Sequence, residues 1–195
     1  MPKNYWMVVQ TPENFEISKE LGFTVHGLKS RNRRRAQRME PDDRILFYVE
    51  GIRKWTAITS ITSRYFEDRT PIWKSKSRGD ELPYRVKMAP SIVLKEKDYI
   101  DALILAPRLE YVKRWAPEDW PLAFVDTLHL LPQRDFRLIE GEMKRILRRG
   151  RTRGRRGGRR RGGGDGRGAS READRREQPA GGGEPHSAAE GSADG

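Results

Sequence analysis

Residues 45–62, ILFYVEGIRKWTAITSIT, predict two neighbouring strands. Ile45 to Val49 is apolar throughout, which is typical of a strand buried on both faces. Gly51 breaks this run, and residues 55–62 then alternate with a period of two. One side of this second strand is expected to carry Trp55, Ala57, Thr59 and Ile61. The short separation favours an antiparallel pair.

The segments on either side of this pair predict further strands and marginal helices. Tyr5 to Gln10 is rich in β-forming residues, and a helix follows with Thr11 as N-cap, Pro12 at its first position and Gly22 at its end. Ser30 can cap a second helix over residues 31–39. Pro41-Asp42-Asp43 is a turn, residues 69–82 a long loop, and Tyr84 to Leu94 a strand interrupted at Pro90.

The C-terminal part of the folded region predicts helices. Residues 99–113 permit two short helices around Pro107, and residues 133–148 have apolar side chains at helical spacing. Strands in the middle with helices at the margins predict an α+β domain around a small, strongly bent sheet or barrel.

The last quarter of the chain has a different composition. Fourteen of the 19 glycines lie between Gly150 and Gly195, and this segment holds no Leu, Ile, Val, Met or aromatic residue. It cannot bury enough apolar surface to offset the entropy lost on ordering. We therefore expect residues 1–147 to carry the fold and residues 148–195 to form a disordered Arg/Gly-rich tail that ends in an acidic, glycine-containing segment.

Composition excludes several classes of protein. The absence of cysteine removes disulfides, thiolate metal sites and a Cys nucleophile, and no run is apolar enough to span a membrane. We expect a soluble, cytoplasmic protein without membrane contact. His26, His129 and His186 are too scattered to indicate a metal site, and nothing points to a cofactor. His129 lies among leucines, which favours a core histidine.

Positive charge indicates a polyanionic partner. The net charge is +12, and nine arginines lie between Arg148 and Arg161. The helix predicted over residues 31–39 carries five arginines with no acid between them, which repel one another and favour an anionic ligand. The phosphate-binding residues predicted from charge and from neighbouring aromatic rings are Arg31, Arg33, Arg34, Arg35, Arg38, Lys113, Arg114, Arg148, Arg149, Arg151, Arg153, Arg155 and Arg156.

Aromatic residues stand beside cations in several places, as in Lys113-Arg114-Trp115, Trp73-Lys74 and Tyr84-Arg85. Aromatic faces stack on bases while cations hold phosphates, so this arrangement is typical of nucleic-acid binding. Trp6, Trp55 and Trp120 are alternatively simple core residues, whereas Trp73 and Trp115 fit either role.

The order of motifs resembles the EVE domain, a PUA-like family related to YTH domains. The resemblance rests on Tyr5-Trp6, the segments 12–15 (PENF), 25–27 (VHG) and 41–43 (PDD), then Ile72-Trp73, residues 83–86 (PYRV), 113–115 (KRW) and 135–139 (DFRLI). It extends over residues 5–147 and implies a compact β-barrel-like sheet flanked by helices. It also implies a pocket for a base, often a modified one, turned out of its strand.

Carried over position by position, the resemblance implies a pocket built from Gln10, His26, Gly27, Tyr48, Trp73 and Trp115. His26 stands where relatives often have Trp, so we expect a partly polar cage with a different preferred base. Asp42 stands where relatives often have Gly, which implies an altered turn. An aromatic cage would recognise an enlarged base by stacking and shape, with Gln10 reading a base edge.

The sequence therefore predicts a module that binds DNA or RNA through one base and its phosphates, not an enzyme. Two alternatives remain open. One is an enzyme that processes nucleic acid with Asp42, Asp43, Glu118 and Asp119, the only dense acids. The other is an RNA-binding adaptor that acts mainly through its tail.

Overall fold

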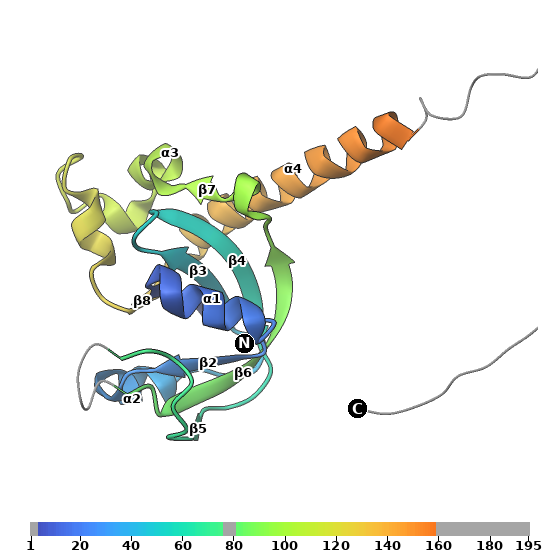
Figure 1. Ribbon diagram of the computed structural model, residues 1–195. Coiled ribbons are helices and arrows are strands. Elements are labelled where there is room, and N and C mark those ends of the chain that lie inside the picture. Colours follow the sequence, from blue (N-terminus) through green and yellow to red (C-terminus); the bar gives the residue numbers. More distant parts are fainter. Residues whose placement is uncertain (1–3, 76–80, 159–195) are drawn as a thin grey trace, which may run out of the picture.

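A computed structural model describes residues 4–75 and 81–158, with side chains up to residue 150. It is a mixed α+β domain around one curled sheet (Figure 1). The main sheet has the order β2-β6-β4-β3-β1-β8, with the short strands β5 and β7 pairing β6 and β4. The strands are β1 (Tyr5–Gln10), β2 (Val25–Leu28), β3 (Arg44–Val49), β4 (Lys54–Ile61), β5 (Phe66–Glu67), β6 (Tyr84–Val93), β7 (Ile100–Asp101) and β8 (Leu128–Leu130).

The central strands confirm the prediction from residues 45–62. β3 and β4 form an antiparallel pair, and β1 lies parallel to β3 with Tyr5 opposite Arg44. Successive residues of β3 contribute to two separate apolar clusters, Leu46 to one and Phe47 to the other, because the strand is buried on both faces. The α+β class and the bent sheet are thus as expected.

Two register shifts bend the sheet, and the first of them changes which side of the sheet the side chains of β4 point to. The register shifts opposite Phe47 and Tyr48, so that Thr56 is an extra residue between Trp55 and Ala57. Trp55 therefore packs in one cluster and Ala57 in the other, not on one side as the alternation predicted. A second shift, between Ile58 and Thr59, leaves Ser91 as an extra residue of β6 beside Pro90. The interruption predicted at Pro90 is therefore an irregularity within one continuous strand.

Helices cover both faces of the sheet (Figure 1). The α-helices are α1 (Pro12–Glu20), α2 (Arg33–Ala36), α3 (Ala102–Leu105) and α4 (Gln133–Gly158), and the short 3-10 helices are η1 (Ser30–Asn32), η2 (Glu96–Asp98), η3 (Ala106–Arg108), η4 (Glu110–Val112) and η5 (Trp120–Phe124). Thr11 caps α1 by accepting from the Asn14 backbone N–H, as predicted. The predicted helix over residues 31–39 is only the single turn of α2 preceded by η1, and the Ser30 side chain caps neither.

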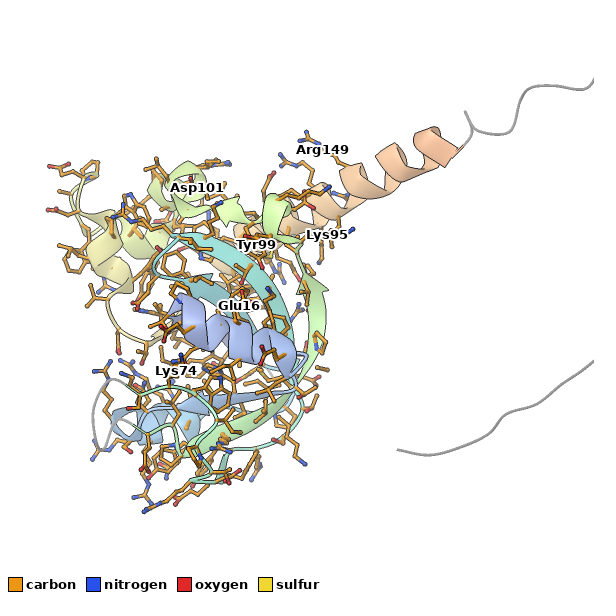
Figure 2. All side chains as sticks on the ribbon, viewed as in Figure 1. Glu16, Lys74, Lys95, Tyr99, Asp101 and Arg149 are labelled. Carbon is orange, nitrogen blue, oxygen red and sulfur yellow. The ribbon has the colours of Figure 1, made fainter. Side chains whose placement is uncertain are left out.

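Helix α4 is longer than the sequence predicted. Its start agrees with the pattern, and Phe136, Ile139 and Met143 are fully buried against the sheet. The helix then runs on to Gly158 and extends beyond the body of the domain, where Arg149 lies (Figure 2). Residues 148–158, expected in the disordered tail, are therefore helical, and the rest of that tail lies outside the described residues.

Buried tryptophans and one histidine complete the core. Trp6, Trp55 and Trp120 are buried, as the core interpretation predicted. His129 is buried with both ring nitrogens bonded: Nε2 donates to the Asp126 carbonyl (2.7 Å), and Nδ1 accepts from the Tyr111 hydroxyl (2.8 Å). The interpretation as a satisfied core histidine is confirmed. No helix in residues 4–75 and 81–158 is long and apolar enough to cross a membrane.

Candidate base-binding pocket

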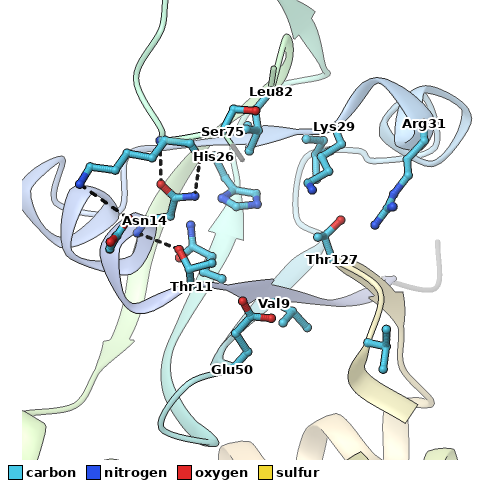
Figure 3. Close-up of a pocket in the computed structure, with 16 residues that line it drawn as sticks. Val9, Thr11, Asn14, His26, Lys29, Arg31, Glu50, Ser75, Leu82 and Thr127 are labelled. Atoms are coloured by element: carbon cyan, nitrogen blue, oxygen red, sulfur yellow. Dashed lines mark hydrogen bonds and ion pairs between the residues drawn. The ribbon is translucent and has the colours of Figure 1, made fainter. Parts of the chain in front are cut away.

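A pocket of about 370 Å³ lies where the end of β1, the first turn of α1 and strand β2 meet. Figure 3 shows Thr11, His26, Lys29 and Thr127 around one hollow. Ligand sites of small molecules begin at about this volume. Its lining consists of Val9, Gln10, Thr11, Glu13, Asn14, His26, Gly27, Leu28, Lys29, Arg31, Glu50, Lys74, Ser75, Leu82, Val125 and Thr127.

Gln10 is the last residue of β1, and a serine of α1 fixes its side chain. Its Nε2 donates to the Ser18 hydroxyl at 2.9 Å, and both side chains are buried. Its Oε1 is buried as well, but has no hydrogen-bond partner in the described structure. An unsatisfied buried acceptor costs about 1–3 kcal/mol, so this oxygen is a natural contact for a ligand donor.

His26, in β2, also lines this pocket and carries a second unpartnered polar atom. Its Nδ1 is buried and has no partner within the part of the chain that is described. The ring packs edge-on against Phe47 and Trp73, at centroid distances of 5.7 and 5.9 Å. Burial lowers the pKa of His26 to about 4, so the imidazole is neutral at pH 7. A neutral ring can hydrogen-bond an uncharged base edge.

Gly27 lets Trp73 pack directly beneath this end of the pocket. A Cβ at position 27 would lie 2.5 Å from Cζ3 of Trp73 and 2.8 Å from Cβ of Leu82. The Trp73 indole N–H donates to Ser18 at 3.2 Å, and the Arg85 guanidinium covers its ring at 5.5 Å. Trp73 is thus held from two sides, and only a glycine fits against it.

The loop that carries Trp73 is fastened to the fold by its neighbours. Arg85 is almost fully buried and pairs with the Asp68 carboxylate and the Thr70 carbonyl. Asn14 bonds the Lys74 backbone twice, through its Oδ1 at 2.8 Å and its Nδ2 at 2.9 Å (Figure 3). These contacts place Lys74 and Ser75 at the pocket.

The structure brings together three of the six pocket residues that the resemblance implied. Gln10, His26 and Gly27 line the pocket. Trp73 packs under Gly27 and is buried rather than lining this pocket. Tyr48 packs in the core against Phe124, and burial raises its pKa to about 12.

Trp115 lies at a different hollow. It is 38% exposed and lines a wider, open depression with Arg114, Arg35 and Leu122. This depression borders the pocket, because Arg31 and Val125 line both. The expected cage of aromatic rings is therefore absent from the described lining, in which His26 is the one aromatic ring. The apolar part of the walls is aliphatic, formed by Val9, Leu28, Leu82 and Val125, and most of the other lining residues are polar or charged.

The basic segment around α2 divides into paired and unpaired arginines. Arg31 and Arg35 both bond Asp126, at 2.9 and 2.7 Å, so one carboxylate offsets part of their charge. Arg33 stacks over Tyr84 at 5.9 Å, and no ion pair joins Arg33, Arg34 or Arg38 to another described residue. Lys113 is paired with Glu110, and Arg114 stacks over Tyr111.

The four acids considered for catalysis do not form one cluster. Asp43 is buried, and its carboxylate accepts from the Asn4 backbone and side chain, the Trp6 indole N–H and the Glu40 backbone. Asp42 adopts a positive φ of 75° in the turn, whereas Glu118 and Asp119 are exposed in a distant segment. Among the described residues, no three His, Asp or Glu side chains gather in a way that could hold a metal ion.

Sequence reasoning missed several residues of the site, above all Ser18, which holds Gln10, and Thr127, which lines the pocket. Ser18 is a polar residue on the buried side of α1, between Phe15 and Leu21, and that pattern alone could have drawn attention to it. Thr127 precedes β8, a strand of only three residues without a clear alternating pattern. Nothing in the sequence could place it beside β1.

Comparisons with known proteins identify the family of the chain. The family model of the EVE domain matches residues 4–117, which is more than half of the chain. A UPF0310 protein of Pyrococcus abyssi (strain GE5 / Orsay) is 28% identical over 148 residues, which are 70% of this chain and 97% of that protein.

Two solved structures share the fold. The YTH domain of mmi1, determined as an RNA complex, matches with a TM-score of 0.55 and 10% identity, over 75% of this chain and 85% of that one. The YTH domain of Zygosaccharomyces rouxii MRB1, in complex with N6-methyladenosine RNA, matches with a TM-score of 0.52 and 15% identity, over 73% and 89%.

Proposed function

Because the chain belongs to the EVE domain family, we propose that its pocket binds a single base of DNA or RNA, turned out of its strand and carrying a modification. The observation that carries this proposal is the pair of buried, unpartnered polar atoms, Gln10 Oε1 and His26 Nδ1, on two residues that line one pocket. A base edge supplies hydrogen-bonding groups in one plane, which could satisfy such atoms. The MRB1 domain, which is similar in fold, binds N6-methyladenosine RNA, and this likeness supports a modified base.

The pocket walls suit the faces of a base. Val9, Leu28, Leu82 and Val125 provide apolar surface on several sides, while His26 and Gln10 provide polar groups. Shape and apolar contact then favour an enlarged base, although without the stacked aromatic rings that the resemblance implied. His26 contributes no charge at pH 7, because burial holds its pKa at about 4.

The rest of the nucleic acid is held through phosphates in this proposal. Arg33, Arg34 and Arg38 are exposed on and after α2, and Arg31 lies at the rim of the pocket itself. Helix α4 carries Arg148 and Arg149 away from the domain body, with seven further arginines up to Arg161 in the sequence. Such contacts add affinity that is independent of base identity.

We propose binding rather than turnover. The enzyme alternative needs acids that are available for chemistry, and the carboxylate of Asp43 already accepts four hydrogen bonds within the fold. The tail-driven adaptor differs from this proposal in one measurable respect. It predicts equal binding of all bases, whereas a base pocket predicts a preference.

The first prediction tests the pocket. Labelled DNA and RNA oligonucleotides, each with one central N6-methyladenine, 5-methylcytosine or 5-hydroxymethylcytosine or its unmodified counterpart, are titrated with the full chain near physiological salt. One modified base is expected to bind at least tenfold more tightly than its counterpart, a difference of about 1.4 kcal/mol. Gln10→Leu should remove this preference, since it deletes the polar reader while keeping the volume.

The matched control is Gln37→Leu, which makes the same chemical change at an exposed position after α2. It should keep the preference. Three results would contradict the proposal. The protein without substitutions could bind all oligonucleotides equally, the preference could survive Gln10→Leu, or the labelled strand could be cleaved in the presence of a metal ion.

The second prediction concerns salt. For single strands, each phosphate contact contributes about 0.7 to the slope of log affinity against log salt. Replacing Arg33, Arg34 and Arg38 by glutamine should lower that slope by about 2, and replacing the nine arginines between 148 and 161 should lower it by up to about 6.

Arg31 and Arg35 serve as the comparison, because both already pair with Asp126. Their replacement should change the slope less per residue. The preference between bases should be unchanged in the Arg33, Arg34 and Arg38 variant. An unchanged slope there would show that α2 does not contact phosphates.

A further inference from the structure

The Ser18 hydroxyl is saturated by three hydrogen bonds. Its oxygen accepts from Gln10 Nε2 at 2.9 Å and from the Trp73 indole N–H at 3.2 Å. Its single hydrogen is donated to the Asn14 carbonyl, at 3.0 Å, one turn earlier in α1. A hydroxyl has one hydrogen and two lone pairs, so every hydrogen-bonding position of this group is used.

This saturation determines which way the Gln10 amide points. If the amide were rotated, its oxygen would face the Ser18 oxygen and would need the hydrogen that Ser18 gives to Asn14. The rotated form therefore has one hydrogen bond fewer. In the observed form the amide nitrogen faces Ser18, and Oε1 is the atom left buried without a partner.

We infer that Ser18, by orienting Gln10, makes this site selective for a base whose edge presents an N–H donor. The amino groups of adenine and cytosine and their N-monomethylated forms are such donors, whereas a carbonyl in that place would face another acceptor. This inference rests on the proposed function and adds the chemical class of its ligand. Ser18 is a positioning residue, since it acts through Gln10 and does not itself line the pocket.

Two bases of the same shape, one with an N–H group and one without it, test the inference on the unmutated protein. The same oligonucleotide carries adenine or 6-methylpurine, N6-methyladenine or 6-ethylpurine, or cytosine or 4-methylpyrimidin-2-one at its centre. Each pair exchanges an N–H group for a carbon group of nearly equal size. In the pair that contains the tightest-binding of these six bases, the N–H member should bind at least tenfold more tightly, because its partner leaves Gln10 Oε1 unsatisfied.

Ser18→Ala then separates positioning from mere support of the fold. Without the hydroxyl, the Gln10 amide can turn its nitrogen toward the ligand and donate to a carbonyl. The preference for an amino base over its carbonyl analogue (adenine over hypoxanthine, or cytosine over uracil) is expected to be at least tenfold before the substitution and should therefore fall to about threefold or less. Thr59→Val is the matched control, since it removes another buried hydroxyl, one that contacts Met88 and belongs to a residue that does not line this pocket. It should keep the full preference.

The outcomes are distinguishable. Binding that depends on Gln10 but treats both members of each pair alike overturns the donor inference and leaves the proposed function standing. A tenfold preference for the amino base over its carbonyl analogue that persists in a folded Ser18→Ala protein overturns the role of Ser18. Absence of any preference among bases, modified or not, overturns the proposed function together with the inference.

Discussion

Gly27→Ala is expected to lower the free energy of unfolding by about 1–3 kcal/mol and to weaken base binding in the same protein. The new methyl carbon would meet Trp73 at 2.5 Å and Leu82 at 2.8 Å, distances at which an atom must move. Trp73 has little room to retreat, because Ser18 holds its indole N–H and Arg85 lies over its ring. The remaining adjustment is a displacement of β2, which carries His26.

Gly141→Ala is the matched control for this prediction. Gly141 lies in α4, and a Cβ there meets no atom within 4 Å. Since alanine is favoured over glycine inside a helix by up to about 1 kcal/mol, this variant should be neutral or stabilised. Chemical denaturation of both variants gives the unfolding energies, and the oligonucleotide titration gives the binding. If both alanines had the same effect, the close packing of Trp73 under Gly27 would be refuted.

The second large effect is a pH dependence of stability caused by His26. Its pKa is about 4 in the folded protein, because burial disfavours the charged ring, and the ordinary value is 6.5. Between these two values the unfolded chain binds a proton that the folded chain does not. The free energy of unfolding should therefore fall as the pH is lowered from 7 to 4, by on the order of 3 kcal/mol from this residue alone.

His26→Asn isolates this contribution. Carboxylates titrate in the lower part of the same range, and His129, whose pKa is also lowered by burial, contributes with the same sign. The carboxylates and His129 contribute equally in the protein without substitutions and in the variant. The difference between the two curves of unfolding free energy against pH therefore gives the contribution of His26. Urea denaturation at several pH values between 7 and 4 measures it. Parallel curves would show that His26 is not buried as the neutral form.

Much of the fold was predictable from the sequence, because local patterns determine it. The uniformly apolar run 45–49 marked a central strand, and Thr11-Pro12 marked the start of α1. The apolar spacing of Phe136, Ile139 and Met143 marked α4. The end of α4 was not predicted, since glycine-rich composition argued against the helix that continues to Gly158.

The candidate site was predictable only in part. Gln10, His26 and Gly27, which the resemblance implied, lie on β1 and β2 and line the pocket. Trp115 and Tyr48 were expected in the same pocket on the basis of residue type and family resemblance. The structure places Trp115 at the neighbouring depression and Tyr48 in the core, because those positions depend on the path of the chain after β7 and on the bulge near Tyr48.

By itself, the sequence determined a basic protein with a bent α+β domain, a buried central strand pair and a resemblance to base-binding domains. These properties follow from composition and from patterns between near neighbours in the chain. Tertiary structure decided that Ser18 joins Gln10 to Trp73, that Gly27 accommodates the indole, and that His26 is buried as a neutral ring. The physical reason is that hydrogen-bond saturation and desolvation depend on which residues, distant in sequence, share a small buried volume.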